Sequence, residues 1–426
     1  MSPERNNAPP SMFVEFLLNL DSRFFHLSNG IPVHIISGGT QEVMRIELVF
    51  RAGSWYQPAK SVATTTNFLI PNGTASRSAD EISEYFDFYG SYLETNTGKD
   101  NAYLTLYTLN KHYKNTLPLL AEVLMDAVFP EQEVEIYKKN KHQSLAVNMQ
   151  KVKYLARTHF NEQLFGSNHP YGKRLLFEDI DRLEQSQFQQ FHRQFYRPEN
   201  CMIFVSGVIH DELEQDLEKY LGPFRGNGTI LPFVPSYHSA SSKDRKQLIS
   251  KPDVTQSAVR IGMPTINRTH PDYQGLFVLN TVLGGYFGSR LMTNIREDKG
   301  YTYGINSMLA SLQHSGAWMI ASEVGAGVRE KAVKEIYKEI RKLRRIPVSA
   351  DELDLVKNYL LGALMRSMDG PFAVAERLRS AIEYGQNKDY YLQYANTIRQ
   401  ITAERLHQLA NQYFDEKTFF ETVAGV

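Results

Sequence analysis

Short runs of β-branched and apolar residues alternate along this chain with longer stretches in which apolar residues recur at helical spacing. The short runs predict strands, because such residues favour extended backbone. They lie at residues 31–36, 44–50, 102–107 and 201–205. Apolar residues three and four positions apart, at 119–124 and 333–340, predict helices that bury one face. Strands and helices are therefore expected to mix in both halves of the chain.

Two of the predicted helices begin with the same polar signature. Ser78 is followed three residues later by Glu81, and Ser349 is followed by Glu352. In a capping box, the serine oxygen accepts a bond from the third helical N–H, and the glutamate accepts one from the serine backbone. Both pairs predict this arrangement, and the first helix is expected to run toward Gly90.

The two halves of the chain resemble each other weakly, which predicts an internal duplication. Three pairs carry the similarity: Arg45 with Arg260, residues 133–138 with 352–357, and Gly90 with Gly300. Their offsets are 215, 219 and 210 residues, so insertions or deletions must separate the copies. Chance matching of short runs is the alternative.

A stretch rich in glycine, proline and serine predicts a domain boundary at residues 223–246, which we interpret as a linker. We expect an N-terminal domain at 1–222 and a homologous C-terminal domain at 247–426, each of ordinary domain size. The fold class is α+β, with two tandem homologous α/β domains. Each is expected to hold a mostly antiparallel sheet flanked by helices.

The composition excludes several classes of function. Lysine plus arginine and aspartate plus glutamate both number 47, so the chain lacks the positive excess of nucleic-acid binders or anionic-membrane proteins. A hydrophobic content of 42% excludes a disordered chain. The single cysteine, Cys201, excludes an internal disulfide and a thiolate metal cluster, and it fits a reducing compartment. Its apolar neighbours predict an inert core thiol.

The first residues carry no clear targeting signal. Met1–Pro10 is polar, and the apolar run Met12–Leu18 is short and contains Glu15. Because no small-residue cleavage site follows, we interpret this run as the first ordered element rather than a signal peptide. No stretch approaches the roughly 18 apolar residues of a membrane-spanning helix. We expect a cytoplasmic protein, with the periplasm as the alternative.

The twelve histidines form none of the short-range pairs that bind zinc on one helix face. His159 and Glu162 are a lone pair at a spacing of three, which we interpret as structural. The sequence also lacks a P-loop and a G-x-S-x-G motif, and the glycines at 284–288 do not have dinucleotide-binding spacing. The sequence therefore contains none of the motifs that would indicate a complete active site within this chain.

A series of landmarks from about Ser28 to the C-terminus nevertheless carries a family resemblance. They are Asn29-Gly30-Ile31-Pro32-Val33, Phe50-Arg51-Ala52-Gly53-Ser54, Asn72-Gly73-Thr74, Arg77–Ile82, His169-Pro170-Tyr171-Gly172, Phe195–Asn200, Leu283-Gly284-Gly285 and Ile295–Tyr303. Their order and spacing resemble the pitrilysin/insulinase family of zinc peptidases, specifically its short two-domain processing-peptidase-like branch. The resemblance also implies a duplicated α/β architecture.

The same resemblance implies that the metal site is missing. Active members carry H-x-x-E-H on a helix shortly before the Asn-Gly-Thr turn, where two histidines bind zinc and the glutamate activates its water. Here Thr64 and Phe68 stand at the histidine positions and Asn67 stands at the glutamate position. The third ligand, a glutamate, falls near Ser144 or Leu145. We therefore expect this chain to hold no metal.

The second half keeps residues that the resemblance places at a substrate. In this family the C-terminal domain contributes an arginine and a tyrosine seven residues apart, and Arg296 and Tyr303 have that spacing, with Tyr301 as the rival phenol. Both groups can donate hydrogen bonds to a scissile carbonyl, and these bonds strengthen as an oxyanion forms. Gly284 and Gly285 imply either a helix-ending turn or a glycine-rich loop that engages substrate.

Two functions follow from the resemblance. In the first, the chain is the non-zinc-binding subunit of a heterodimeric zinc metalloendopeptidase that cleaves peptides in an enclosed chamber. A homologous partner with H-x-x-E-H would supply zinc and base, and this chain, inactive alone, would supply Arg296 and Tyr303. The alternative is a catalytically dead structural or peptide-binding subunit, as a homodimer or an assembly protein. Neither function involves nucleic acid or a membrane.

Overall fold

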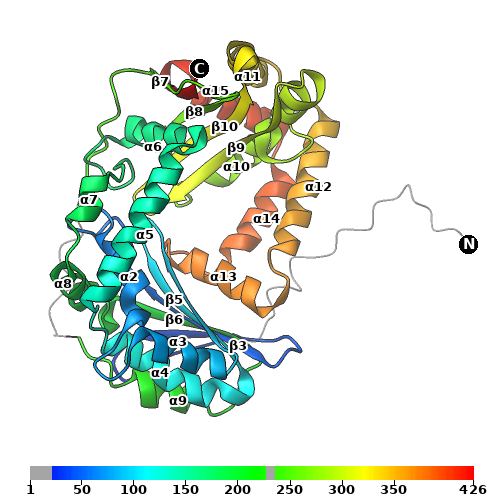
Figure 1. Ribbon diagram of the computed structural model, residues 1–426. Coiled ribbons are helices and arrows are strands. Elements are labelled where there is room, and N and C mark those ends of the chain that lie inside the picture. Colours follow the sequence, from blue (N-terminus) through cyan, green and yellow to red (C-terminus); the bar gives the residue numbers. More distant parts are fainter. Residues whose placement is uncertain (1–21, 227–235) are drawn as a thin grey trace, which may run out of the picture.

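The computed structural model describes residues 22–226 and 236–426, which form two β-sheets surrounded by helices (Figure 1). The expected element at Met12–Leu18 and residues 227–235 of the expected linker lie outside the described residues. Each half combines a mostly antiparallel sheet with helices, as expected. The α+β fold class is therefore confirmed.

The first sheet has six strands in the order β1-β2-β6-β3-β5-β4. Neighbouring strands are antiparallel except β2 and β6, which are parallel. Their bounds are β1 Ser22–His26, β2 Pro32–Ser37, β3 Val43–Phe50, β4 Tyr92–Thr97, β5 Ala102–Leu109 and β6 Cys201–Gly207. The central strand β3 is buried on both faces along most of its length, as a strand between two layers must be.

The second sheet has five strands in the order β7-β11-β8-β10-β9, and only β7 and β11 are parallel. Their bounds are β7 Lys246–Ser250, β8 Gln256–Thr265, β9 Thr302–Leu312, β10 Ser315–Gly325 and β11 Phe420–Gly425. This order and pairing repeat those of β2-β6-β3-β5-β4, so β1 alone has no counterpart. The repetition supports the duplication inferred from the sequence, and the central strands β3 and β8 each carry one of the paired arginines, Arg45 and Arg260.

Five α-helices lie between β5 and β6 in the first half, and five lie between β10 and β11 in the second. The first half has α2 Val62–Leu69, α3 Ala79–Phe88, α4 Tyr113–Met125, α5 Glu131–Met149, α6 Val152–Phe165, α7 Phe177–Asp181, α8 Gln185–Phe195 and α9 Leu213–Leu221. The second has α10 Tyr273–Asn280, α11 Arg329–Arg345, α12 Ala350–Arg366, α13 Gly370–Ile382, α14 Tyr390–Gln400 and α15 Ala403–Tyr413. Short helical turns are η1 Ile70–Asn72, η2 Asn110–His112, η3 Pro198–Asn200, η6 Ala326–Val328 and η7 Glu416–Thr418, with π-helical segments at η4 Thr281–Gly285 and η5 Met292–Asp298. None of the helices in the described ranges has the length and apolar character needed to cross a bilayer.

Each half lends one helix to the sheet of the other half. Helix α13 from the second half lies against β2 and β6, and α6 from the first half lies against β8 and β11 (Figure 1). The seams are polar as well as apolar. Arg379 on α13 pairs with Glu47 on β3 at 3.0 Å, and Gln163 on α6 accepts a 2.7 Å bond from the Thr422 hydroxyl on β11. The inner face of each sheet is therefore completed by the other half.

The two predicted capping boxes turn out differently. At α3, the Ser78 oxygen accepts a bond from the backbone N–H of Glu81 while the Glu81 carboxylate accepts one from the Ser78 backbone, so this box is confirmed. At α12, Ser349 accepts the bond from the Glu352 backbone, but the Glu352 carboxylate is held by Arg290 through bonds of 2.8 and 2.7 Å. The prediction of a complete second box was wrong, because a bidentate arginine binds the carboxylate more strongly than a backbone N–H does.

Each sheet has its own hydrophobic core between the strands and the helices of its half. In the second half the largest fully buried side chain is Trp318 on β10, whose indole N–H donates to the Asn280 amide oxygen at 2.9 Å. Burying a large apolar side chain contributes about 1.5–3 kcal/mol, provided that its polar atom is satisfied as here. Cys201 is also fully buried, and burial raises the pKa of its thiol, in agreement with an inert core cysteine.

Candidate active site

Helix α2 carries all three residues that stand at the positions of the zinc motif. Asn67, at the glutamate position, is buried, and its amide nitrogen donates to the backbone oxygens of Asn96 and Tyr103 at 2.8 and 3.2 Å. Its amide oxygen accepts a 2.9 Å bond from the Tyr196 hydroxyl. Complete burial raises the pKa of Tyr196 well above its ordinary value, so this phenol stays a neutral donor. Asn67 therefore braces α2 against β4 and β5.

The other positions of the motif are equally unsuited to a metal. Phe68 is 49% exposed and packs on the ring of Tyr137 from α5, with centroids 5.1 Å apart. Leu145 is buried in the core, and Ser144 borders a small cavity of about 260 Å³ together with Phe68. Zinc needs imidazole, thiolate or carboxylate ligands. The residues present do not fit zinc, and within the described ranges no three histidine, cysteine or acidic side chains are grouped to hold a metal.

Asn280 in the second half repeats the bonding of Asn67. It ends α10, its amide nitrogen donates to the backbone oxygen of Ser307 on β9 at 3.2 Å, and its amide oxygen accepts from Trp318. In both halves, an asparagine on the helix that follows the central strand is thus bonded to the sheet and to one buried aromatic donor. Asn67, which the family resemblance places at the position of the catalytic base, therefore has the same kind of bonding as Asn280.

Tyr303 begins β9 at the free edge of the second sheet and is 89% exposed. It lines a cavity of about 500 Å³ together with Arg260 on β8, Glu323 on β10 and Lys153. Lys153 comes from α6 of the first half and pairs with Glu323 at 3.5 Å, so both halves form the wall of this cavity. Its open side presents a phenol and backbone groups of an edge strand, which can bond an extended peptide.

A buried arginine sets the charge of this cavity. Arg260 donates to the backbone oxygen of Val259 at 3.0 Å. Burial lowers the pKa of its guanidinium, and Glu323 opposes that shift. An arginine remains protonated even so. The cavity therefore holds a fixed positive charge partly balanced by Glu323.

Arg296 lies on η5, directly before β9, and its guanidinium carbon sits 4.8 Å from the centre of the Phe287 ring. The elements that carry Arg296 and Tyr303 contact each other. Tyr301, the rival phenol, is partly buried and packs against the second core. Arg296 and Tyr303 thus lie on adjacent elements. The cavity is lined by Tyr303 and, from η5, by Met292. That Arg296 and Tyr303 act together on a substrate stays a prediction.

The two glycines of η4 differ in their surroundings. Gly284 is buried, and a Cβ at this position would lie 2.7 Å from the backbone nitrogen of Ser307. Gly285 is exposed. Gly284 is therefore required for the close approach of η4 to β9, while Gly285 remains available to a substrate.

The sequence did not predict a functional role for several residues of the site. Tyr196 lies in a family landmark but carried no assigned role, while Lys153, Glu323 and Phe287 were not considered. Phe287 is exposed although it is large and apolar, and it stands two residues after Gly285. That position beside a glycine pair is the one signal that could have pointed to it.

Two family models match the chain. The one described as "Insulinase (Peptidase family M16)" matches residues 33–176, and the one described as "Peptidase M16 inactive domain" matches residues 182–360. A Bacillus subtilis protein described as an uncharacterized zinc protease is 25% identical over 394 residues, which cover 91% of this chain and 94% of that protein. A Rickettsia felis protein with the same description is 23% identical over 406 residues, covering 92% and 95%.

Solved structures share the fold. A peptidase M16 inactive domain from Pseudomonas fluorescens superposes with a TM-score of 0.86 at 23% identity, covering 95% of this chain and 98% of the other. A protease from Helicobacter pylori gives 0.86 at 18% identity, covering 95% and 99%. A chain of complex III2 from Candida albicans gives 0.78 at 17% identity, covering 95% of both chains.

Proposed function

The chain belongs to the insulinase family of peptidases, family M16, and we propose that it is the non-zinc-binding subunit of a two-chain zinc metalloendopeptidase. A homologous partner chain with an intact H-x-x-E-H helix would complete the enzyme. The substrate would be an extended peptide enclosed between the two chains. Alone, this chain would have no peptidase activity.

The observation that carries the proposal is the contrast between Asn67 and Tyr303. Asn67 uses its amide group in three internal hydrogen bonds. Tyr303 instead presents its phenol to an open cavity at a sheet edge. The position that should perform catalysis has become structural, whereas the position that should contact substrate is exposed.

The residues of this chain would act on the peptide carbonyl. Zinc bound to the partner would supply the activated water. The hydroxyl of Tyr303 would donate one hydrogen bond to the carbonyl oxygen, and the guanidinium of Arg296 would donate another. Both bonds strengthen as negative charge develops on that oxygen. To reach the carbonyl, Arg296 would leave the Phe287 ring, a contact worth about 0.5–1 kcal/mol at an exposed site.

The test begins with purification of the chain from its native host together with any chain that co-elutes in equal amount. Peptide cleavage by the pair should require zinc and both chains. Arg296→Ala should lower kcat about 100-fold, because it removes a donor to the oxyanion. Tyr303→Phe should lower kcat in the same direction, while the matched Tyr301→Phe should leave it unchanged. Turnover unaffected by Arg296→Ala would contradict the assigned role.

A second candidate is a catalytically dead structural or peptide-binding subunit. It is favoured by the contact of Arg296 with Phe287, which gives this arginine a role without a reaction. In that case no H-x-x-E-H chain should co-purify. Arg296→Ala should then change peptide binding or assembly without any zinc-dependent cleavage to lose.

A further inference from the structure

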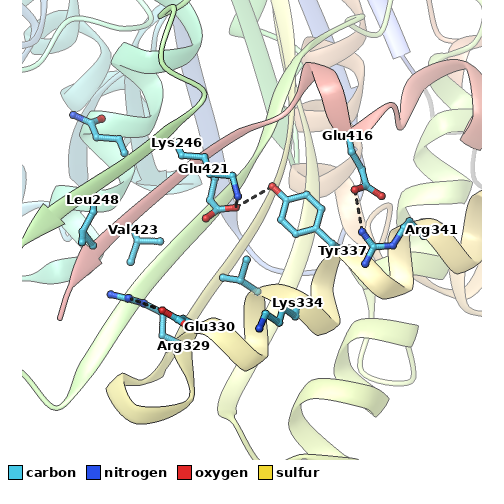
Figure 2. Close-up of a pocket in the computed structure, with 12 residues that line it drawn as sticks. Lys246, Leu248, Arg329, Glu330, Lys334, Tyr337, Arg341, Glu416, Glu421 and Val423 are labelled. Carbon is cyan, nitrogen blue, oxygen red and sulfur yellow. Dashed lines mark hydrogen bonds and ion pairs between the residues drawn. The ribbon is translucent and has the colours of Figure 1, made fainter.

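The outer face of the second sheet carries a groove of about 670 Å³ between β7 and α11 (Figure 2). Lys246 and Leu248 of β7 form one wall, and Val333, Lys334 and Tyr337 of α11 form the other. Its described lining comes only from β7, α11, η7 and β11. The groove lies at the β7 edge of the sheet, whereas Tyr303 lies on β9 at the opposite edge.

The duplication shows what fills the same place in the first half. By strand order β7 corresponds to β2, and α11 corresponds to α4, because each helix directly follows a short 3-10 turn after the matching strand. In the first half, β1 pairs with the free edge of β2 and α9 packs against α4. The leucines of α9 are completely buried; they are Leu213, Leu217 and Leu221.

Burial differs accordingly between the two places. Val33 and Ile35 of β2 are fully buried, whereas Leu248 of β7 is 57% exposed. On the helices, α4 buries residues on nearly all sides, while Val333 and Tyr337 of α11 are only half-buried. The exposed Leu248 and the half-buried Val333 and Tyr337 therefore form an apolar surface that no described element covers.

The segment that precedes β7 does not take the place of β1. The backbone N–H of Ala240 donates to the oxygen of Phe165 at 3.0 Å, and that of Ser242 donates to the oxygen of Gln163 at 2.9 Å. These bonds attach the segment to the end of α6. Within the described ranges β7 pairs with β11 alone.

The groove has a small excess of positive charge. Its lining holds four cationic side chains, Lys246, Arg329, Lys334 and Arg341, and three acidic ones, Glu330, Glu416 and Glu421. Most charges in the groove are paired, including Arg341 with Glu416 at 3.0 Å and Lys246 with Glu421 at 3.5 Å. Lys334 is exposed and has no ion pair or hydrogen bond with any described residue. A ligand of the groove can therefore gain a carboxylate contact to Lys334.

Helix α9 has the matching chemistry. Its apolar residues recur every four positions, and acidic residues flank them. Two of these carboxylates contact the start of α4: Glu212 pairs with Lys114, and Asp216 accepts a 2.7 Å bond from the Tyr113 hydroxyl. On α11 the two positions that match Tyr113 and Lys114 are Arg329 and Glu330, and Lys334 lies about one turn further along the helix.

We propose that the groove binds an acidic amphipathic helix of a partner chain, seated on α11 as α9 is seated on α4 and covering β7. Apolar residues at positions i, i+4 and i+8 of the partner would cover Leu248 and Val333. A carboxylate of its next turn would pair with Lys334. This surface is independent of the proposed peptidase role, which concerns the opposite edge of the sheet.

The test places a photo-crosslinking amino acid, p-benzoylphenylalanine, at position 248 of the full chain in its native host. The control carries the same group at position 355, where Leu355 is 55% exposed on α12 outside the groove. Position 248 should crosslink one partner through a segment with apolar residues four apart and an excess of acids, and position 355 should not. Crosslinking to residues 1–21 of the same chain, to a second copy, to nucleic acid or to nothing would overturn the proposal.

The crosslinked segment is then synthesised, and its helicity and affinity for the full chain are measured. Lys334→Glu should weaken binding at least tenfold, and the matched Lys338→Glu, one turn later on α11 and outside the groove, should change it less than twofold. Equal effects of the two variants, or a segment that binds as an extended strand, would overturn the proposal. Zinc-dependent turnover of the two-chain enzyme should be unchanged by Lys334→Glu, which separates this test from that of the peptidase role.

Discussion

The two halves of this molecule build the same five-strand arrangement and then differ in what covers it. In the first half β1 and α9 close the outer face, whereas in the second half the corresponding face between β7 and α11 is open. In the first half the position of the catalytic base is a structural asparagine, whereas in the second half Tyr303 faces an open cavity. The two halves thus share the five-stranded sheet. Binding surfaces arise where one half lacks a strand or helix that covers the sheet in the other half.

The central strands show the same contrast on their inner faces. Arg45 on β3 reaches Glu376 on α13 at 2.7 Å, and Glu47 reaches Arg379. β8 also carries an arginine, Arg260, but the residue two positions after it is Gly262, whereas Glu47 stands two positions after Arg45. The contact between α13 and the first sheet therefore depends on buried charges. The contact between α6 and the second sheet lacks this arginine–glutamate pair.

The largest expected effect comes from removing the charge that holds α13 to the first sheet. Arg379→Met would leave the buried carboxylates of Glu47 and Glu383 without their cation, which should lower the free energy of unfolding by about 3–5 kcal/mol. Urea unfolding of the full chain measures this. Arg379→Lys, which keeps the charge, should lose clearly less.

The same variant should acquire a pH dependence. Burial raises the pKa of Glu47 and of Glu383 above the ordinary 4.5, and Arg379 opposes that rise. A raised carboxyl pKa means that the folded state binds more protons than the unfolded state, so stability falls as pH rises through the folded pKa. Arg379→Met should therefore be more destabilised at pH 8 than at pH 5. An equal loss at both values would show that the arginine acts by packing.

The next effect tests whether Asn67 and Asn280 are equivalent braces. Asn67→Ala would remove two bonds to the backbone oxygens of Asn96 and Tyr103 and the acceptor of the buried Tyr196 hydroxyl, and Asn280→Ala would remove the bond to Ser307 and the acceptor of the Trp318 indole N–H. Each should cost about 2–3 kcal/mol of unfolding free energy. The exposed Asn140→Ala, measured in the same way, should stay within about 0.5 kcal/mol of the parent. A large loss from one asparagine alone would break the comparison between the halves.

The smallest effect concerns the two helix caps. Ser78→Ala and Ser349→Ala should each lower the unfolding free energy by about 1 kcal/mol, because each loses one bond to a helical N–H. The glutamates should differ: Glu352→Ala releases the part-buried Arg290 and keeps the backbone bond to Ser349, while Glu81→Ala removes only the glutamate bond of the first box. Thermal unfolding should therefore show a greater loss for Glu352→Ala than for Glu81→Ala.

Local pattern was enough to predict much of the fold. The runs at 31–36, 102–107 and 201–205 correspond to β2, β5 and β6, and the cap at Ser78 forms as expected. These features depend on neighbours within a few residues, which the sequence displays directly. The family resemblance also predicts that Thr64, Asn67 and Phe68 form one degenerate motif; the structure places the three residues on α2, and their assignment to the motif stays a prediction.

Features that depend on distant parts of the chain could not be predicted in the same way. A helical pattern shows that α6 and α13 each bury a face, but it does not show that this face lies on the other half's sheet. Likewise, Glu352 has the right spacing for a cap, and only the fold brings Arg290 close enough to take its carboxylate. The bracing of Asn67 required Tyr196, which is remote in sequence and unremarkable in pattern.

The exchange of α6 and α13 has a consequence for how this protein is made. During synthesis the strands of the first sheet all leave the ribosome before residues 370–382, which form α13. Until then the inner face of that sheet carries Arg45 and Glu47 without the partners that bury them. The nascent first half therefore cannot complete this part of its packing until the second half emerges.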